Sequence, residues 1–228
     1  LDGSLLYVTE NDTVSLVGKI GIYDANDAYK KVAEFDSYGI GPHELIMHPD
    51  SETLVIANGG IKTEQASREE LNLDTMRPSL VYLNRHDGTL LQQVTPEHMP
   101  NNQWQRFHQY IASVAVDSER NLLCVTTPIG GCAAIYDLHT RELIDDVSLP
   151  DCAGASVLVS SDASMSKIDK HAELTGFIVS DGQGQLTALR VNALPEVKLD
   201  VGDIEPHERI IKDSQLHMMS FDNHLQAL

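Results

Sequence analysis

The stretch SYGIGPHELIMHPDSETLVIANGGIKT, residues 37–63, decides the fold. Its centre holds two short apolar runs, 43–47 and 53–57, separated by a polar turn. Runs of this length that are closed by Pro, Asp and Gly are typical of a β-hairpin. The flanks are unusual, because Gly-Ile-Gly-Pro-His-Glu precedes the first run and Asn-Gly-Gly-Ile-Lys follows the second. The stretch therefore predicts a hairpin with special chemistry at one end.

The hairpin belongs to a sequence pattern, called the phrase here, that recurs along the chain. An acidic turn precedes an apolar run at Asp2, Asp50 and Asp117, and a second apolar run follows each. The second runs are KIGIYDAN, SLVYLNRHDG, CAAIYDLHTRE and, more weakly, QLTALRVN. A repeat of a little over fifty residues follows when four positions are taken as equivalent, namely Tyr23, Tyr82, Tyr136 and Leu189.

Each repeat contains four short strand patterns, and helical periodicity is nearly absent. The second and third repeats predict strands at about 43–47, 53–57, 79–84 and 89–94, then 110–116, 122–126, 132–137 and 142–148. The fourth predicts strands at about 155–160, 174–179, 185–190 and 196–201. Four strands at this period are the signature of β-propeller blades, whereas a sandwich does not normally repeat its phrase and a solenoid uses shorter units.

We therefore expect an all-β fold, a β-propeller of four-stranded antiparallel blades in a single domain, 1–228. The complete blades are predicted at 43–94, 110–149 and 155–201, and partial blades at 1–36 and 216–228. Three complete blades and two partial ones cannot close a ring unless the partial ones combine. The sequence thus predicts the C-terminal portion of a larger propeller.

Composition excludes several functions. The formal net charge of −18 repels a phosphate backbone, so nucleic acid is a poor partner. No transmembrane segment is expected, since no run approaches the roughly 20 apolar residues that span a bilayer. The three cysteines form no zinc knuckle. Cys124 and Cys132 flank a turn almost symmetrically, so a cross-strand disulfide competes with two buried free thiols as the prediction for this pair.

In a propeller, the loops after the second and fourth strands of each blade open on one face. Both flanks of the quoted hairpin then emerge at a shared rim, with the long connection from Ile61 to Pro78 beside it. Two glycines can bring backbone N–H groups toward a ligand there. The candidate ligand-binding residues are Glu10, Asn11, His43, Glu44, Asn58, Gly59, Gly60, Lys62, Asn72, Asp74, Arg77, His108 and Tyr110.

The chemistry at this rim stays open between alternatives. His43, Glu44 and His108 could ligate a divalent metal or iron, although no zinc-type spacing is present. His43 and Glu44 could instead hydrogen-bond neighbouring blade loops. No nucleophile elbow, phosphate loop or dinucleotide fingerprint is present, so the sequence favours a binding protein over an enzyme without deciding the question.

Several motifs in order resemble one known family. The runs SYGIGPHEL, TLVIANGGIKT, LNLDTMRPSLVYL, QYIASVAVD and FDNHL resemble the DUF1513 family of secreted bacterial proteins of unassigned biochemical function. The resemblance covers essentially the whole chain and is strongest in 37–84. It transfers family pattern, without any catalytic role, onto His43, Glu44, Asn58, Gly59, Gly60, Asn72, Asp74, Met76 and Pro78.

The resemblance implies further expectations that the residues themselves do not supply. It implies a seven-bladed propeller, a periplasmic location and a role near iron uptake, with periplasmic iron-uptake proteins as partners. We therefore expect a non-catalytic periplasmic propeller that binds a metal species, a small ligand or a partner protein on one face. The alternative is a metal-dependent, lactonase-like hydrolase with its site at the channel mouth.

Overall fold

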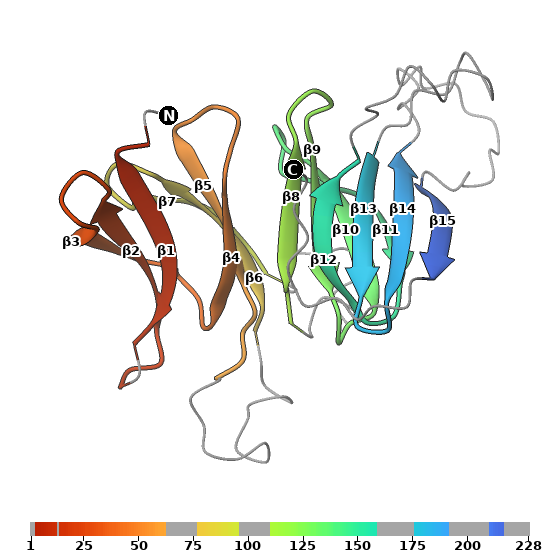
Figure 1. Cartoon of the computed structure of the whole chain (residues 1–228), viewed down its shortest axis with the longest axis horizontal. Helices are drawn as coiled ribbons and strands as arrows, with labels where there is room; N and C mark the ends of the chain where they lie inside the picture. The colour runs from red at the N-terminus through yellow and green to blue at the C-terminus, as the bar shows by residue number, and fades with distance from the viewer. Residues whose placement is uncertain are drawn as a thin grey trace.

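The computed structural model describes residues 3–12, 14–62, 77–95, 110–158, 176–191 and 210–216. Every regular element in these ranges is a β-strand, which confirms the all-β prediction. Four antiparallel sheets follow one another in chain order, as Figure 1 shows. Among these residues there is no helix long and apolar enough to cross a membrane.

Each sheet is a simple meander in which neighbouring strands follow one another in sequence. The first sheet contains β1 (Leu5–Asn11), β2 (Gly18–Asp24) and β3 (Lys30–Asp36). The second contains β4 (Pro42–Met47), β5 (Thr53–Asn58), β6 (Ser79–Asn84) and β7 (Leu90–Val94). The third contains β8 (Ser113–Asp117), β9 (Leu122–Thr127), β10 (Cys132–Asp137) and β11 (Leu143–Ser148), and the fourth β12 (Cys152–Val157), β13 (Gly176–Asp181), β14 (Gln185–Val191) and β15 (Ile210–Leu216).

The strands of the second and third sheets lie where the repeat predicts them. The fourth sheet differs in its last strand, because β14 pairs with β15 at 210–216, whereas the predicted strand at 196–201 lies outside the described residues. The connection before this strand is therefore much longer than the repeat suggested. The phrase that defined the repeat is weakest in this part of the chain, so the period could not place its final strand.

One equivalence taken from the sequence is wrong by one residue. Tyr23 and Tyr136 pair with Leu6 and Leu123 on the preceding strand, but the residue of the second sheet at this position is Leu83, not Tyr82. Side chains alternate between the two faces of a sheet. A shift of one residue therefore makes the aromatic ring of Tyr82 point to the opposite face from the rings of Tyr23 and Tyr136. Tyr82 accordingly faces the third sheet.

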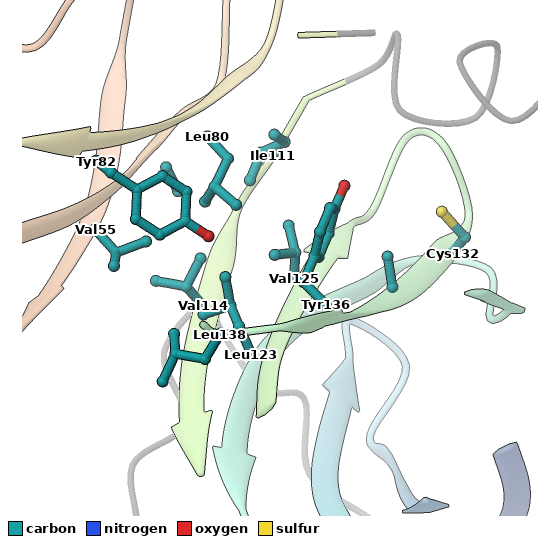
Figure 2. Packing of buried hydrophobic residues seen from close by; sticks show 12 residues of the cluster. Val55, Leu80, Tyr82, Ile111, Val114, Leu123, Val125, Cys132, Tyr136 and Leu138 are labelled. Carbon is teal, nitrogen blue, oxygen red and sulfur yellow. The ribbon is translucent and has the colours of Figure 1, made fainter. Parts of the chain in front are cut away.

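The sheets pack face to face, and each interface holds an apolar core. Tyr82 and Tyr136 meet between the second and third sheets, together with Val55, Leu80 and Val125 (Figure 2). Burial raises the pKa of both tyrosine hydroxyls. The guanidinium carbon of Arg141 lies 4.6 Å from the centre of the Tyr82 ring, so a cation–π contact adds to this interface.

Of the two alternatives for Cys124 and Cys132, the structure has the free thiols, because both residues are unbridged and buried. Cys124 pairs across the hairpin with Ile135, whereas Cys132 pairs with Thr127. Cys132 belongs to the core against the second sheet and Cys124 to the core against the fourth. The two sulfur atoms therefore lie on opposite faces of one sheet, where no disulfide can join them.

The first strands of the second, third and fourth sheets, β4, β8 and β12, lie side by side and are called the inner strands here. Adjacent inner strands are linked by hydrogen bonds that involve side chains, not by the backbone hydrogen bonds of a β-ladder. Glu44 Oε2 accepts the Val114 N–H at 2.8 Å, and Ser113 Oγ accepts the Ala155 N–H at 3.2 Å. Thr126 Oγ1 also donates to the Ala153 carbonyl at 2.6 Å.

These contacts set the direction of the sheets. Glu44 joins the start of β4 to the start of β8, and Ser113 joins the start of β8 to the middle of β12. Thr126, near the end of β9, contacts Ala153 at the start of β12. The inner strands therefore run the same way. Because the strands within a sheet are antiparallel, β5 ends where β4 begins, with Asn58 paired with Pro42. The starts of the inner strands and the ends of their partners therefore lie at one end of the molecule.

We predict that Glu44→Ala destabilises the fold by about 1–3 kcal/mol, because the Val114 N–H on a buried residue loses its acceptor. Glu44→Gln keeps a carbonyl acceptor and should cost less. Glu119→Ala, at an exposed turn, is the control and should stay within about 0.5 kcal/mol of the parent. Chemical denaturation measures all three, and equal stability of the Ala and Gln variants would contradict the assignment.

Candidate ligand-binding rim

The rim is defined here as Gly39–Glu44, Asn58–Lys62, Arg77 and Tyr110. It lies where β4 begins, β5 ends and the chain enters β8. The hydrogen bond from Val114 to Glu44 holds the two inner strands together just below it. Both flanks of the quoted hairpin therefore belong to one surface.

The two flanks bind each other. The Gly59 N–H donates to the Gly41 carbonyl and the Gly60 N–H to the Ile40 carbonyl, each at 2.8 Å. The sequence suggested that these N–H groups approach a ligand, whereas the structure uses both of them inside the protein. The unusual flanks thus form an extension of the β4–β5 hairpin.

Two glycines of the rim have other protein atoms so close to their backbone that no side chain would fit. A Cβ at Gly39 would collide with the side chain of Asn58. Gly60 has φ +81°, and a Cβ there would lie 2.7 Å from the Arg77 carbonyl carbon. The rim is therefore packed tightly, and its backbone has little room to move.

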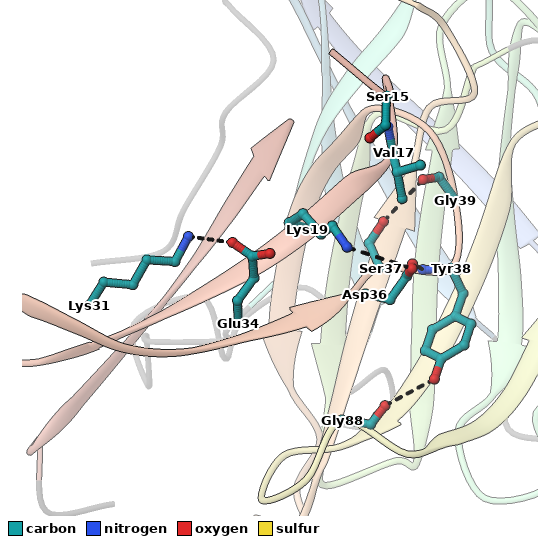
Figure 3. A network of polar contacts seen from close by, with 10 residues as sticks. All are labelled: Ser15, Val17, Lys19, Lys31, Glu34, Asp36, Ser37, Tyr38, Gly39 and Gly88. Atoms are coloured by element: carbon teal, nitrogen blue, oxygen red, sulfur yellow. Dashed lines mark hydrogen bonds and ion pairs between the residues drawn. The ribbon is translucent and has the colours of Figure 1, made fainter. Parts of the chain in front are cut away.

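Asn58 is a fully buried connector beneath the rim. Its Nδ2 donates to the Ser37 carbonyl at 3.0 Å and to Ser79 Oγ at 3.2 Å. Ser37 also donates through Oγ to the Gly39 carbonyl, as Figure 3 shows. Asn58 thus ties the segment that leaves the first sheet to the second sheet.

His43 and Tyr110 form an aromatic pair on the rim. Their ring centres lie 5.4 Å apart with an interplanar angle of 80°, an edge-to-face arrangement. The Tyr110 ring packs over Gly59, where a Cβ would lie 2.5 Å from Cε2. Burial raises the pKa of the Tyr110 hydroxyl. His43 lies in β4 and Tyr110 in the segment just before β8, so the rim joins side chains from distant parts of the sequence.

The backbone of Tyr110 lies in the left-handed region, with φ +65°. This conformation costs a non-glycine residue on the order of 1 kcal/mol, and strain of this kind clusters at functional sites. The chain nevertheless places a bulky side chain there. Tyr110 is therefore the rim residue whose conformation most indicates a purpose beyond packing.

Metal ligation was predicted for His43, Glu44 and His108. One Glu44 oxygen accepts the Val114 N–H, which fits the alternative that this residue links neighbouring sheets. His108 lies outside the described residues. Within the described ranges, no group of three His, Cys, Asp or Glu side chains could hold a metal ion. The predicted metal site therefore remains a hypothesis that needs His108.

Glu10 and Asn11 lie at the same end of the molecule but apart from the aromatic pair. Glu10 accepts a hydrogen bond from the Tyr23 hydroxyl and pairs with Lys31 Nζ at 2.6 Å. Lys31 also pairs with Glu34, as Figure 3 shows. This polar group lies on the face of the first sheet opposite the core residue Ile20, away from the second sheet.

The remaining predicted residues divide between the described and undescribed parts of the chain. Lys62 is half-buried and Arg77 is exposed, and both lie at the two ends of the long connection on the rim. Asn72 and Asp74 lie outside the described residues. The sequence missed Ser37 and Ser79, which hold Asn58, because a lone serine beside a glycine-rich stretch carries no distinctive signal.

Comparisons with known proteins indicate the fold of this chain but assign no activity to it. A family model described as "Protein of unknown function (DUF1513)" matches residues 1–98 and 92–228. A solved structure described as the dihydro-heme d1 dehydrogenase NirN in complex with DHE is similar, with TM-score 0.54 and 10% identity. The match covers 96% of this chain but only 36% of NirN, so the chain spans about a third of that protein's length. No curated protein matches.

We predict that Gly59→Ala displaces the Tyr110 ring from His43, because the added Cβ would lie 2.5 Å from that ring. Overpacking of this kind costs about 1–3 kcal/mol. Near-UV circular dichroism and chemical denaturation report the two effects. Gly182→Ala is the control: its closest contact is the Asp151 carboxylate, a side-chain tip that can rotate away. Equal effects of both substitutions would contradict the packing described.

We also predict an acid-sensitive contribution from Glu10. Burial raises its pKa, but the hydrogen bonds from Lys31 and Tyr23 outweigh that effect, so the pKa is lowered overall. A lowered carboxyl pKa contributes stability above the unfolded value of about 4.3, and this contribution is lost as the pH falls through the folded value.

Glu10→Gln should therefore reduce the loss of stability between about pH 5 and pH 3. Unfolding free energies measured across this range test the effect. Glu119→Gln, at an exposed turn, is the matched control and should leave the pH dependence unchanged. An unchanged pH dependence in Glu10→Gln would contradict the role of the Lys31 pair.

Proposed function

The chain belongs to the DUF1513 family of proteins of unknown function, and from its β-propeller-like fold we propose that it is a non-catalytic binding protein whose site is the rim. The observation that carries this proposal is the His43–Tyr110 pair. His43 lies in β4 and Tyr110 in the segment before β8, and the Tyr110 backbone is left-handed, with φ +65°. Such strain persists where it serves a function.

Charge supports the same surface. The chain has a formal net charge of −18, yet the rim includes the two cationic residues Lys62 and Arg77. Cationic groups on an acidic protein attract negatively charged ligand groups. Half-buried aromatic rings and cations together suit a small, flat, anionic ligand or its metal complex. A metal species, a small ligand and a partner protein all remain within this proposal.

The wider setting is part of the proposal and derives from the family resemblance. We place the protein in the periplasm, near iron uptake, with a divalent metal or iron as the ligand or part of it. The same resemblance supports a seven-bladed ring with this chain as its C-terminal portion. NirN, the similar solved structure, is described in complex with DHE, which makes a haem a reasonable probe.

The alternative function is a metal-dependent, lactonase-like hydrolase. It requires a metal held by at least three protein ligands with an open position for water. Of the predicted ligands, Glu44 has one oxygen engaged by the Val114 N–H, and His108 lies outside the described residues. The hydrolase is therefore the weaker proposal, and it predicts a metal that does not leave on dialysis.

The test uses the full-length natural protein with Fe²⁺, Fe³⁺, Zn²⁺ and haem as probes. Equilibrium dialysis and metal analysis measure binding to the parent and to two rim variants, His43→Ala and Tyr110→Ala. We expect at least one probe to bind, with affinity about tenfold weaker in both variants. His86→Ala is the matched control: this exposed histidine pairs with Glu52 away from the rim and should leave affinity unchanged.

Three outcomes separate the possibilities. Weaker binding in the rim variants alone supports the binding protein. A tightly held metal together with lactone hydrolysis that Glu44→Gln retains and His43→Ala abolishes supports the hydrolase. Binding of no probe, or equal affinity in all variants, contradicts a small-ligand site at the rim. Capture of a periplasmic protein that requires residues 61–78 would then favour a partner.

A further inference from the structure

Asn58 and Gly59 form the one Asn-Gly pair in the sequence, and it lies on the rim. An asparagine followed by glycine is chemically labile, because glycine carries no Cβ to hinder attack of its backbone nitrogen on the side-chain amide carbon. The attack closes a succinimide ring and releases ammonia. The rim therefore contains two neighbouring residues that can react with each other without a cofactor.

The native structure engages both reacting groups. The Gly59 N–H, on the attacking nitrogen, donates to the Gly41 carbonyl at 2.8 Å. Asn58 Nδ2, the leaving group, donates to the Ser37 carbonyl and to Ser79 Oγ. Asn58 is also the last residue of β5, which pairs with a neighbouring strand on each edge. Its backbone is therefore held extended, and the attacking nitrogen cannot turn toward the side chain.

The carbonyl oxygen of the same amide is unusual. Asn58 is fully buried, and within the part of the chain that the structure describes its Oδ1 accepts no hydrogen bond. Attack on the amide carbon would place a negative charge on this oxygen, and a desolvated oxyanion without a donor is strongly disfavoured. The folded rim therefore holds the amide where its reaction is slowest.

Close packing prevents the amide from leaving this position while the rim is intact. A Cβ at Gly39 would lie 2.4 Å from Asn58 Cγ, so the Gly39 backbone lies directly against the amide. The Gly39 carbonyl is itself held by the Gly18 N–H at 2.9 Å and by Ser37 Oγ at 3.3 Å. Reaction consequently requires the flank 37–41 to separate from the end of β5.

We propose that Asn58 is a self-modification site that reacts only when this flank separates from β5, and whose product prevents the rim from closing again. Gly59 N forms a bond to Asn58 Cγ and gives up its proton, while the Cγ–Nδ2 bond breaks and Nδ2 leaves with that proton as ammonia. Water then adds to either carbonyl of the succinimide and opens the ring to aspartate or isoaspartate. Water is the one co-reactant that this step needs.

The product cannot rebuild the contacts of the amide. A carboxylate has no N–H to donate, so the Ser37 carbonyl would face a second acceptor with no proton between them. The new negative charge would also be buried, which is costly for a carboxylate without a cationic partner. Isoaspartate in addition lengthens the main chain by one carbon and moves Gly59 relative to Gly41. A molecule whose rim has opened and reacted is therefore permanently changed.

Mass spectrometry of peptides that contain residue 58 measures the reaction in the full-length natural protein. At one neutral pH and one temperature, we expect Asn58 to react about a hundredfold more slowly in the folded protein than in urea, because only opened molecules react. Equal rates in the two states would overturn the proposal, and so would the absence of reaction in urea.

A serine variant tests the protection by hydrogen bonds. Ser79→Ala removes one acceptor of Asn58 Nδ2 and should raise the folded-state rate about tenfold without changing the rate in urea. Ser118→Ala, at an exposed turn, is the matched control and should leave both rates unchanged. Urea denaturation of each variant gives the contribution from global unfolding. If that contribution accounts for the whole increase in Ser79→Ala, the local opening is refuted.

The effect of the product is tested by Asn58→Asp, which introduces one of the two products directly. It should lower the folding equilibrium constant at least about tenfold, since it buries an unpaired charge. Asn26→Asp, at an exposed turn, is the control and should change this constant by at most about twofold. An Asn58→Asp protein as stable as the parent would contradict the irreversible loss.

The parent protein, aged in urea and then refolded by dilution, gives the same information without a substitution. We expect peptides modified at residue 58 in the fraction that fails to refold, and unmodified peptides in the folded fraction. Recovery of modified peptides in the folded fraction in proportion to their total amount would overturn the proposal.

Discussion

The hydrogen bonds between neighbouring inner strands are the constraint on which the rest of this structure depends. An inner strand pairs with its own sheet on one edge only, so its other edge presents unpaired N–H groups. Glu44 and Ser113 accept two of these groups, from Val114 and Ala155, across the boundary between sheets. A bond of this kind fixes the relative height and direction of adjacent sheets, which apolar packing cannot do.

The rim follows from this constraint. With the inner strands aligned, the segment before β4, the end of β5 and the entry to β8 must share one end of the molecule. The two flanks of the hairpin then satisfy each other, through Gly59 to Gly41 and Gly60 to Ile40. The glycines of the two flanks allow the backbone segments to pack closely against each other, and the N–H groups of Gly59 and Gly60 are used within the protein. What the rim offers outward is therefore its side chains, with the His43–Tyr110 pair at the centre.

The sequence predicted the sheets well because period and turn chemistry are local. It located β4 to β11 within a few residues. It took Tyr82 as the equivalent of Tyr23 and Tyr136, whereas Leu83 holds that position, because a tyrosine one residue away in an apolar run looks the same in sequence. It also allowed a Cys124–Cys132 bridge, since spacing around a turn does not reveal which face a side chain takes.

The candidate site was less predictable for a different reason. Its residues were found by their unusual composition, but their partners come from other sheets. One oxygen of Glu44 accepts the N–H of Val114, seventy residues on, a contact that the sequence does not reveal. Asn58 looked like a ligand contact, yet it holds Ser37 and Ser79. Sequence shows which residues are exceptional, while only tertiary pairing shows whether their polar atoms are already in use.

The acidity of the chain can be understood in the same way. Asp24, Asp137 and Asp181 each accept a backbone N–H two residues on, and so close the turns that leave their strands. Asp50 and Asp117 do the same before β5 and β9. Part of the net negative charge is therefore a consequence of building short strands with tight turns.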